Sequence, residues 1–186
     1  LMNLQVIQND ITNMLVDAIV LPANEQLKEG RGTSKAIFQK AGRKDLSKAC
    51  KEIGSCNVGD AVPTLAYKLD ANYIIQAVVP KWMDGEHQEY EYLSAAYLSA
   101  LNIADVMECE TIAFPLLAAG NNGFDLGLAY EIAKTSIESF EGNNLKSAIL
   151  VVYGDTVATF LKGKGVYVEN AKVFDKIGVI FIVIVY

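Results

Sequence analysis

A short apolar run that leads through a glycine-containing loop into a helical pattern constrains the fold of this chain most. The apolar run is Thr111–Leu117, the loop Ala118–Phe124 contains Gly120 and Gly123, and the helical pattern follows Asp125. Glycine lets a backbone approach a ligand closely, and the first N–H groups of a helix have no acceptor within that helix. A strand, a loop and a helix start in this order therefore predict an anion site made of main-chain groups.

A second unit of the same kind lies near the N-terminus. The apolar residues Ala18–Leu21 lead to the loop Gly30–Ser34, which contains Gly32 and is followed by another helical pattern. Main-chain N–H groups at such positions bind phosphate without a cationic side chain. Two units of this kind in one small domain indicate a diphosphate ligand held between them.

Charge and cysteine content narrow the classes of function. The net charge is −6 and the basic residues do not cluster, which argues against binding to duplex nucleic acid but not against a nucleotide held by backbone amides. Cys50, Cys56 and Cys109 lack the spacing of a metal site, and His87 is the only histidine, so we expect no metal and no cofactor. His87 lies in the polar stretch Asp84–Gln88, which is typical of a surface loop. Reduced thiols favour a cytoplasmic location.

Other common sequence signals are missing or ambiguous. The P-loop pattern and the dinucleotide-binding Gly-x-Gly-x-x-Gly pattern are both absent. No signal peptide or spanning helix is recognisable, and the apolar run Val179–Tyr186 is too short to cross a bilayer, so we expect no membrane partner. Two interpretations of the apolar end Gly178–Tyr186 are open. It is a strand, buried in this sheet or at the edge of a partner's sheet, or it is part of a longer chain.

Strand-like and helix-like segments alternate along the chain. The predicted strands are Leu4–Gln8, Ala18–Leu21, Ala61–Leu65, Tyr73–Val79, Thr111–Leu117 and Ala148–Tyr153. The predicted helices are Thr33–Ala41, Asp45–Glu52, Tyr90–Met107 and the segment after Asp125, in which apolar residues recur at helical spacing from Leu126 to Phe140. This alternation predicts an α/β sandwich with helices on both faces of a sheet. Ligands of such folds bind beyond the carboxyl ends of the strands, where both glycine loops fall.

Six motifs, taken in order, resemble those of the macro domain family, whose members bind ADP-ribose. They are Asn9–Thr12, Val16–Asn24, Gly30–Ile37, Cys56–Ala61 with Thr64 and Tyr67, Tyr73–Trp82 and Phe114–Phe124. The resemblance runs from about Leu4 to about Lys162 and implies a three-layer α/β/α sandwich with a mixed central sheet. We therefore expect residues 1–165 to form a macro-like domain and residues 166–186 a C-terminal extension, which is an extra strand or a truncated continuation.

The resemblance implies roles for residues near the adenine end of the ligand. Asp10 corresponds to the carboxylate that accepts a hydrogen bond from the adenine amino group, and Ile11 corresponds to a residue whose backbone N–H contacts the base. From the residues alone, Asp10 can equally cap a turn with Thr12. Tyr153, at the end of a predicted strand, is a candidate for stacking on adenine, and a tyrosine of the core or rim is the alternative.

The two glycine loops correspond to the family's loops for the diphosphate and the distal ribose. The predicted contacts in the first loop come from Gly32, Thr33 and Ser34, and those in the second loop come from Ala119, Gly120, Asn121, Asn122, Gly123 and Phe124. Asn24 matches the asparagine that approaches the distal ribose in hydrolytic members. Without the resemblance, the glycines of either loop are explained equally well as turn formers.

Several residues depart from the pattern of hydrolytic members. Leu21 replaces an asparagine, and Ser34 replaces an aspartate that orients or activates water. A serine hydroxyl has a far higher pKa than a carboxylate and cannot act as a general base without a partner. Asn122 replaces an aromatic residue that closes over the distal ribose, so we expect a smaller, polar lid. Arg31 either pairs with a phosphate or points to solvent, and Gln76 is expected to be a packing substitution.

Three functions follow from these observations. The first is binding of ADP-ribose, free or attached to a protein, which needs no catalytic group. The second is hydrolysis of mono-ADP-ribose from modified proteins, or of an ester or phosphate of ADP-ribose, with the substrate's own oxygens activating water. The third is binding of another nucleotide or of single-stranded RNA, which the acidic charge makes least favourable.

Overall fold

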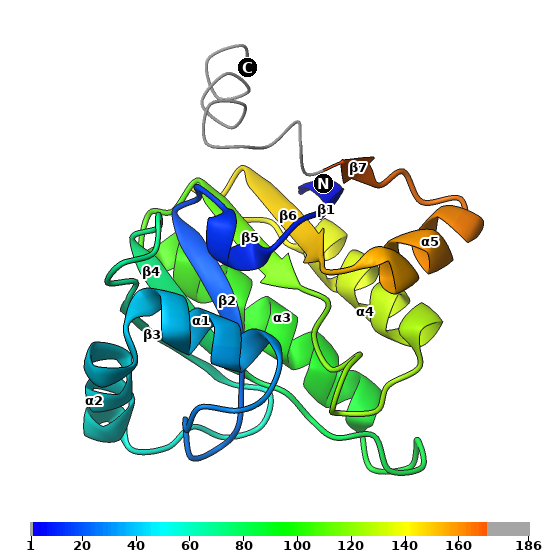
Figure 1. Cartoon of the computed structure of the whole chain (residues 1–186). Helices are drawn as coiled ribbons and strands as arrows, with labels where there is room; N and C mark the ends of the chain where they lie inside the picture. Colours follow the sequence, from blue (N-terminus) through cyan, green and yellow to red (C-terminus); the bar gives the residue numbers. More distant parts are fainter. Residues whose placement is uncertain (1, 171–186) are drawn as a thin grey trace.

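The computed structural model describes residues 2–170, in which helices lie on both sides of a seven-stranded sheet (Figure 1). The strands are β1 (Asn3–Gln8), β2 (Ala18–Ala23), β3 (Ala61–Leu65), β4 (Tyr73–Val78), β5 (Thr111–Pro115), β6 (Ser147–Val152) and β7 (Glu169–Asn170). The helices are α1 (Thr33–Ala41), α2 (Arg43–Ile53), α3 (Glu89–Val106), α4 (Leu126–Ser139) and α5 (Asp155–Gly163), with a 3-10 turn, η1 (Ile11–Asn13). No helix within these residues is both long and apolar enough to cross a membrane.

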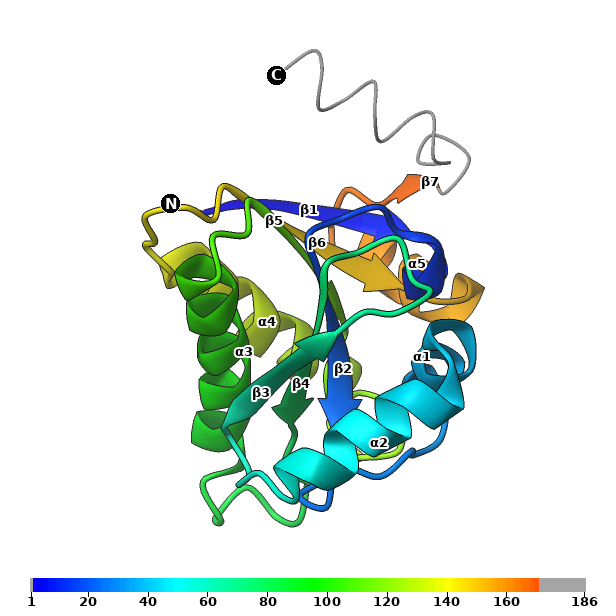
Figure 2. The same cartoon turned by 90° about the vertical axis from the view of Figure 1, so that its left-hand side faces the viewer.

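The sheet separates two apolar clusters, one on each face. Helices α3 and α4 cover one face, and α1 and α2 cover the other (Figure 2). Tyr97 of α3 and Phe114 of β5 are fully buried in the first cluster, with ring centroids 5.1 Å apart. Phe38 of α1 and Leu46 of α2 are buried in the second cluster. Because both faces are covered, the inner strands read as continuous apolar runs rather than as alternating ones.

The order of the strands is β3-β4-β2-β5-β6-β1-β7. All neighbouring pairs are parallel except β3 and β4, which are antiparallel. Pro63 lies in β3, an edge strand, where a residue without an N–H group costs no internal ladder bond. Val152 of β6 pairs with Gln8 of β1, and Val151 pairs with Pro115 of β5. The carboxyl ends of β1, β5 and β6 therefore meet at one edge of the sheet.

The predicted three-layer fold with a mixed sheet is confirmed, and most predicted elements differ from the observed ones by at most two residues at each end. Strand β5 ends at Pro115 rather than Leu117, because the Leu117 amide donates to the Tyr97 hydroxyl (3.0 Å) instead of to a strand. Sequence reasoning missed α5, although Val157, Ala158 and Leu161 follow helical spacing. The apolar end Gly178–Tyr186, for which a strand and part of a longer chain were both open, lies outside the described residues.

Candidate functional site

A cavity of about 450 Å³ opens at the edge where the carboxyl ends of the parallel strands meet. Its walls come from the ends of three strands and from the loop before α1. The lining residues from these parts are Asn9, Asp10 and Ile11 after β1, Gly32 before α1 and Thr33 at its start, Pro115 and Leu116 from the end of β5, and Val151, Val152 and Tyr153 from the end of β6. This is the position in which open α/β sheets bind ligands, and we call the cavity the strand-end pocket.

Asp10 lies in the wall of the strand-end pocket and caps the η1 turn. Its Oδ1 atom accepts hydrogen bonds from the Thr12 amide (2.9 Å) and the Thr12 hydroxyl (2.7 Å). Its own amide donates to the Asn9 side chain (2.8 Å). The other carboxylate oxygen, Oδ2, receives no hydrogen bond from residues 2–170. The turn cap proposed from the sequence is therefore present, and it leaves one acceptor of Asp10 for a ligand.

The first loop (Gly30–Ser34) presents the uncapped start of α1 to the pocket. Gly32 has a left-handed φ of +61° and precedes the helix, and no side chain caps the first N–H groups there. Ser34 is buried, and its hydroxyl accepts a hydrogen bond from the Gly30 amide (2.9 Å). The first loop therefore exposes main-chain donors while the Ser34 side chain holds its shape. Arg31 is exposed and does not line the pocket.

Asn24 has a structural role at the end of β2. Its amide group donates to the Lys28 carbonyl (2.9 Å), and its side-chain oxygen accepts from the Lys28 amide (3.1 Å). This reciprocal pair closes the turn that leads to the first loop. The side chain of Asn24 does not line the strand-end pocket.

The second loop (Ala118–Phe124) is a compact turn whose outer amides are free. Ala118 has a left-handed φ of +67°, and the Phe124 amide donates to its carbonyl (3.1 Å). Within the described residues, the four consecutive amides of 119–122 donate to no acceptor. At the start of α4, Asp125 accepts from the Leu128 amide (3.1 Å), so this amide is not free. The second loop therefore supplies a run of unpaired amides beside the start of α4.

Asn122 and Phe124 anchor the second loop to the chain after β4. The Asn122 side chain donates to the Pro80 carbonyl (2.8 Å), and the Trp82 amide donates to the Asn122 carbonyl (2.8 Å). Phe124 is buried and packs edge-to-face on Trp82, with ring centroids 5.2 Å apart. Asn122 therefore anchors the second loop to the chain after β4, and its part in a smaller, polar lid stays a prediction.

The two loops face each other across the pocket. A Cβ atom added to Gly32 would lie 4.0 Å from the side-chain nitrogen of Asn121. A Cβ atom added to Gly120 would meet nothing within 4 Å. The space between the loops is open, and both loops expose unpaired N–H groups at this place.

The structure brings together seven of the predicted site residues in the strand-end pocket. These are Asp10, Ile11, Gly32, Thr33, Ala119, Gly120 and Tyr153. The other six predicted residues do not line it: Asn24, Ser34, Asn121, Asn122, Gly123 and Phe124. Tyr153 is 77% exposed at the rim, so its ring is available to a ligand. The apolar walls from Ala36, Leu126 and Val157 were missed, although Val157 belongs to the apolar pattern of α5.

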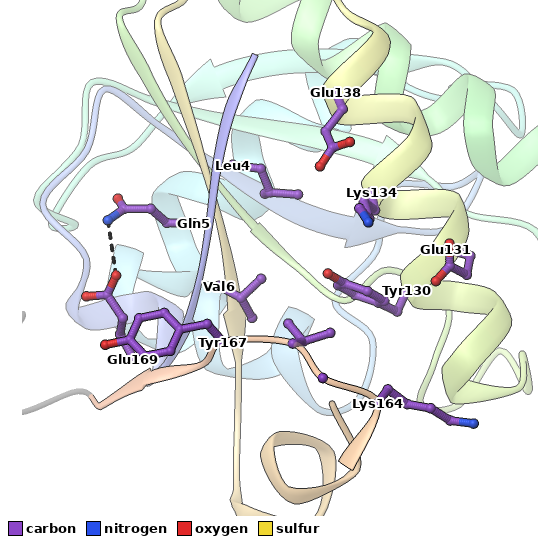
Figure 3. A pocket seen from close by; sticks show the side chains of 12 residues that line it. Leu4, Gln5, Val6, Tyr130, Glu131, Lys134, Glu138, Lys164, Tyr167 and Glu169 are labelled. Carbon is purple, nitrogen blue, oxygen red and sulfur yellow. Dashed lines mark hydrogen bonds between the residues drawn. The ribbon is translucent and has the colours of Figure 1, made fainter. Parts of the chain in front are cut away.

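Two other groups of polar residues do not form a comparable site. Asp84, His87 and Glu89 lie close enough together to suggest metal ligands. However, Glu89 accepts four backbone N–H groups, and His87 Nδ1 lies 2.7 Å from the Asp84 carboxylate, so these side chains already hold the local loop together. A second cavity of about 400 Å³ lies between β1, α4 and the segment before β7 (Figure 3). Both Lys134 and Glu138 line it, and the mixture of charges selects no one class of ligand.

The layered sheet and the strand-end pocket define an α/β/α module with unpaired main-chain N–H groups beside its pocket. The family model of the Macro domain matches residues 20–133, which is more than half of the chain. The chain therefore belongs to the macro domain family, as its motifs predicted.

Known relatives agree with this assignment. A macro domain-containing protein of Listeria monocytogenes is 43% identical over 152 residues, which cover 80% of this chain and 86% of that protein. An O-acetyl-ADP-ribose deacetylase of Salmonella gallinarum is 45% identical over 141 residues, covering 74% and 78%. A solved structure of an Oceanobacillus iheyensis macrodomain variant with ADPR has a TM-score of 0.79 and 28% identity, covering 87% and 90%.

Proposed function

We propose that this protein binds ADP-ribose, free or carried on a modified protein, in the strand-end pocket. The adenine lies beside Asp10 and Tyr153, and the diphosphate lies between the first and second loops. The ADPR-bound relative from Oceanobacillus iheyensis supports this ligand class.

The observation that carries this proposal is the approach of the two loops around one open space. The start of α1 offers uncapped N–H groups, and the second loop offers the amides of residues 119–122. Such groups bind phosphate oxygens without a basic side chain, which agrees with the acidic net charge of the protein. The unused Oδ2 atom of Asp10 is an acceptor, as the exocyclic amino group of adenine requires.

Isothermal titration calorimetry with ADP-ribose, ADP, AMP and NAD tests this proposal. We expect micromolar affinity for ADP-ribose and weaker binding of AMP, which lacks the second phosphate and the distal ribose. No heat with ADP-ribose at millimolar concentration would reject the proposal. Binding of another nucleotide in its place would support the third function considered from the sequence.

Hydrolysis of an ester or protein adduct of ADP-ribose is a second candidate function. The 45% identity to an O-acetyl-ADP-ribose deacetylase favours it. The side chains of Asn24 and Ser34 are occupied by internal hydrogen bonds, so water activation would depend on oxygens of the substrate. Release of acetate from O-acetyl-ADP-ribose, or of ADP-ribose from a mono-ADP-ribosylated protein, should then be faster than the spontaneous release measured without the protein. Equal rates would count against catalysis.

A further inference from the structure

A buried carboxylate organises the chain segment that lies against the second loop. Glu89 is the first residue of α3 and is only 2% exposed. Its Oε2 atom accepts the amides of Met83 (3.0 Å), Asp84 (3.0 Å) and Gly85 (2.7 Å), and its Oε1 atom accepts the amide of His87 (2.6 Å). Four main-chain donors on one carboxylate fix the path of this segment, because each bond restrains a different residue.

The segment held by Glu89 is the one that anchors the second loop. We call residues 80–88 the anchor segment. Pro80 and Trp82 of this segment hold Asn122 through two hydrogen bonds of 2.8 Å. The Trp82 ring lies between the Phe124 ring and Gly85, where an added Cβ atom would lie 3.2 Å from the indole. A chain of direct contacts therefore runs from Glu89 through Trp82 to the second loop.

The other end of α3 carries a similar arrangement that does not reach the strand-end pocket. Asp105 accepts the amides of Asn143 (3.1 Å), Asn144 (2.7 Å) and Leu145 (2.8 Å), which lie between α4 and β6. This carboxylate is also buried and also fixes a loop. It differs from Glu89 in that, among residues 2–170, no hydrogen bond or ring contact joins its loop to the second loop, whereas Pro80 and Trp82 of the anchor segment contact Asn122 and Phe124. Comparison of variants at Glu89 and Asp105 therefore separates an effect on ligand affinity from an effect on folding stability.

We propose that Glu89 is a positioning residue for the second loop, and that it sets how tightly the protein holds the part of the ligand beyond the first phosphate. This inference rests on the proposed binding of ADP-ribose. Adenine and its ribose lie beside Asp10 and Tyr153, which the anchor segment does not touch. The second phosphate and the distal ribose lie against the second loop, whose amides must converge to bind them.

Substitution of Glu89 by glutamine tests the inference. An amide has one acceptor oxygen and places N–H donors toward the backbone N–H groups of the anchor segment, so the segment loses its fixed path. If the second loop then keeps its binding conformation for one tenth of the time, the apparent affinity for ADP-ribose falls about tenfold. We expect affinity for AMP to stay within about twofold of the original value, because AMP does not depend on this loop.

Two controls separate a positioning role of Glu89 from an effect on the stability of the whole protein. Asp105→Asn should lower the free energy of unfolding without changing the ratio of ADP-ribose to AMP affinity. Trp82 is the only tryptophan, so its emission reports on the anchor segment directly. In Glu89→Gln, but not in Asp105→Asn, we expect Trp82 emission to shift to the red and amide hydrogen exchange at residues 119–123 to accelerate.

The outcomes are distinct for the two proposals. Loss of ADP-ribose affinity with retained AMP affinity in Glu89→Gln would support the inference. If wild-type protein binds ADP-ribose and Glu89→Gln binds it equally, or loses both ligands in proportion, the positioning role is overturned and the proposed function stands. If wild-type protein does not bind ADP-ribose, both proposals fall. Should Glu89→Gln not fold, Trp82→Leu breaks the same chain of contacts, and an unchanged affinity ratio in that variant would overturn the inference.

Discussion

The side-chain nitrogen of Asn121 lies 4.0 Å from the position that a Cβ atom would occupy on Gly32. These residues are far apart in the sequence and belong to the first and second loops. Their closeness means that the uncapped start of α1 and the free amides of the second loop border the same space. A ligand with two adjacent phosphates can use both sets of donors at once.

Asp10→Asn should weaken ADP-ribose binding about 10- to 100-fold, the range expected for a hydrogen bond to a charged acceptor. The amide oxygen can keep both bonds to Thr12, while the Oδ2 acceptor becomes a donor that opposes the adenine amino group. Calorimetry with ADP-ribose and AMP checks this, and both ligands should be affected. Thr12→Val, which removes one bond inside the turn, is the matched control. Full affinity in Asp10→Asn would place the adenine elsewhere.

Gly32→Ala should lower both stability and ligand affinity. The left-handed φ of +61° disfavours a residue with a Cβ atom by about 1–2 kcal/mol, and the added methyl group enters the gap between the loops. Gly54→Ala is the control, because Gly54 also has a left-handed φ (+93°) but has nothing within 4 Å of an added Cβ and lies outside the pocket. Chemical denaturation and calorimetry should show that only the Gly32 variant loses affinity.

Ser34→Ala should lower the free energy of unfolding by about 1 kcal/mol, since it removes the buried acceptor of the Gly30 amide. The same substitution should leave any rate of ADP-ribose release unchanged, because the hydroxyl is buried and already hydrogen-bonded. Urea denaturation and a product-release assay measure the two effects. A strong loss of rate with unchanged stability would make Ser34 a catalytic residue.

The stabilising effect of Glu89 should depend on pH in the acidic range. Burial opposes its ionisation, but the bonds from Gly85, Met83, His87 and Asp84 outweigh it and lower the pKa from 4.5 to about 2. Its contribution is therefore complete above pH 4.5 and is lost as the pH falls toward 2. Asp84 raises the pKa of His87, so that contribution is complete below pH 6.5 and stays constant until Asp84, whose own pKa is lowered by bonds from Glu86 and His87, takes up a proton.

Unfolding measured from pH 6 to pH 2 should thus show the free-energy difference between wild type and Glu89→Gln shrinking below pH 4.5. Glu91→Gln, which removes an exposed carboxylate from the same helical turn, is the matched control. A difference that does not change with pH would contradict the assigned pKa.

Gln76→Met should be neutral or should stabilise the protein by about 1 kcal/mol. The Gln76 side chain is fully buried, donates to Cys50 Sγ (2.9 Å) and leaves its Oε1 atom without a partner among residues 2–170. Methionine has a similar volume and no polar atom to satisfy. Ligand affinity should not change, because Gln76 does not line the pocket. A loss of more than about 2 kcal/mol would show that Oε1 has an essential partner.

Local patterns predicted the fold, and about half of the residues predicted for the site line the strand-end pocket. The spacing of apolar residues and the residue composition of each segment define α1 and β4. The order of the motifs places Asp10 and Gly32 at one edge of the sheet. The roles of Asn24 and Asn122 were not predictable, because the reciprocal bonds to Lys28 and the anchoring to Pro80 depend on loop paths that no periodicity encodes. A motif fixes which residue type occupies a position, whereas the partner of its side chain is set by the folded backbone.

The central claim is that main-chain amides of both loops hold one diphosphate, and amide chemical shifts in ¹⁵N-labelled protein test it most directly. On addition of ADP-ribose, the amides of Thr33 and of residues 119–122 should shift together and saturate at one ligand concentration. AMP should shift residues near Asp10 but move residues 119–122 little. Saturation with ADP-ribose while the amides of either loop stay unchanged would contradict the claim.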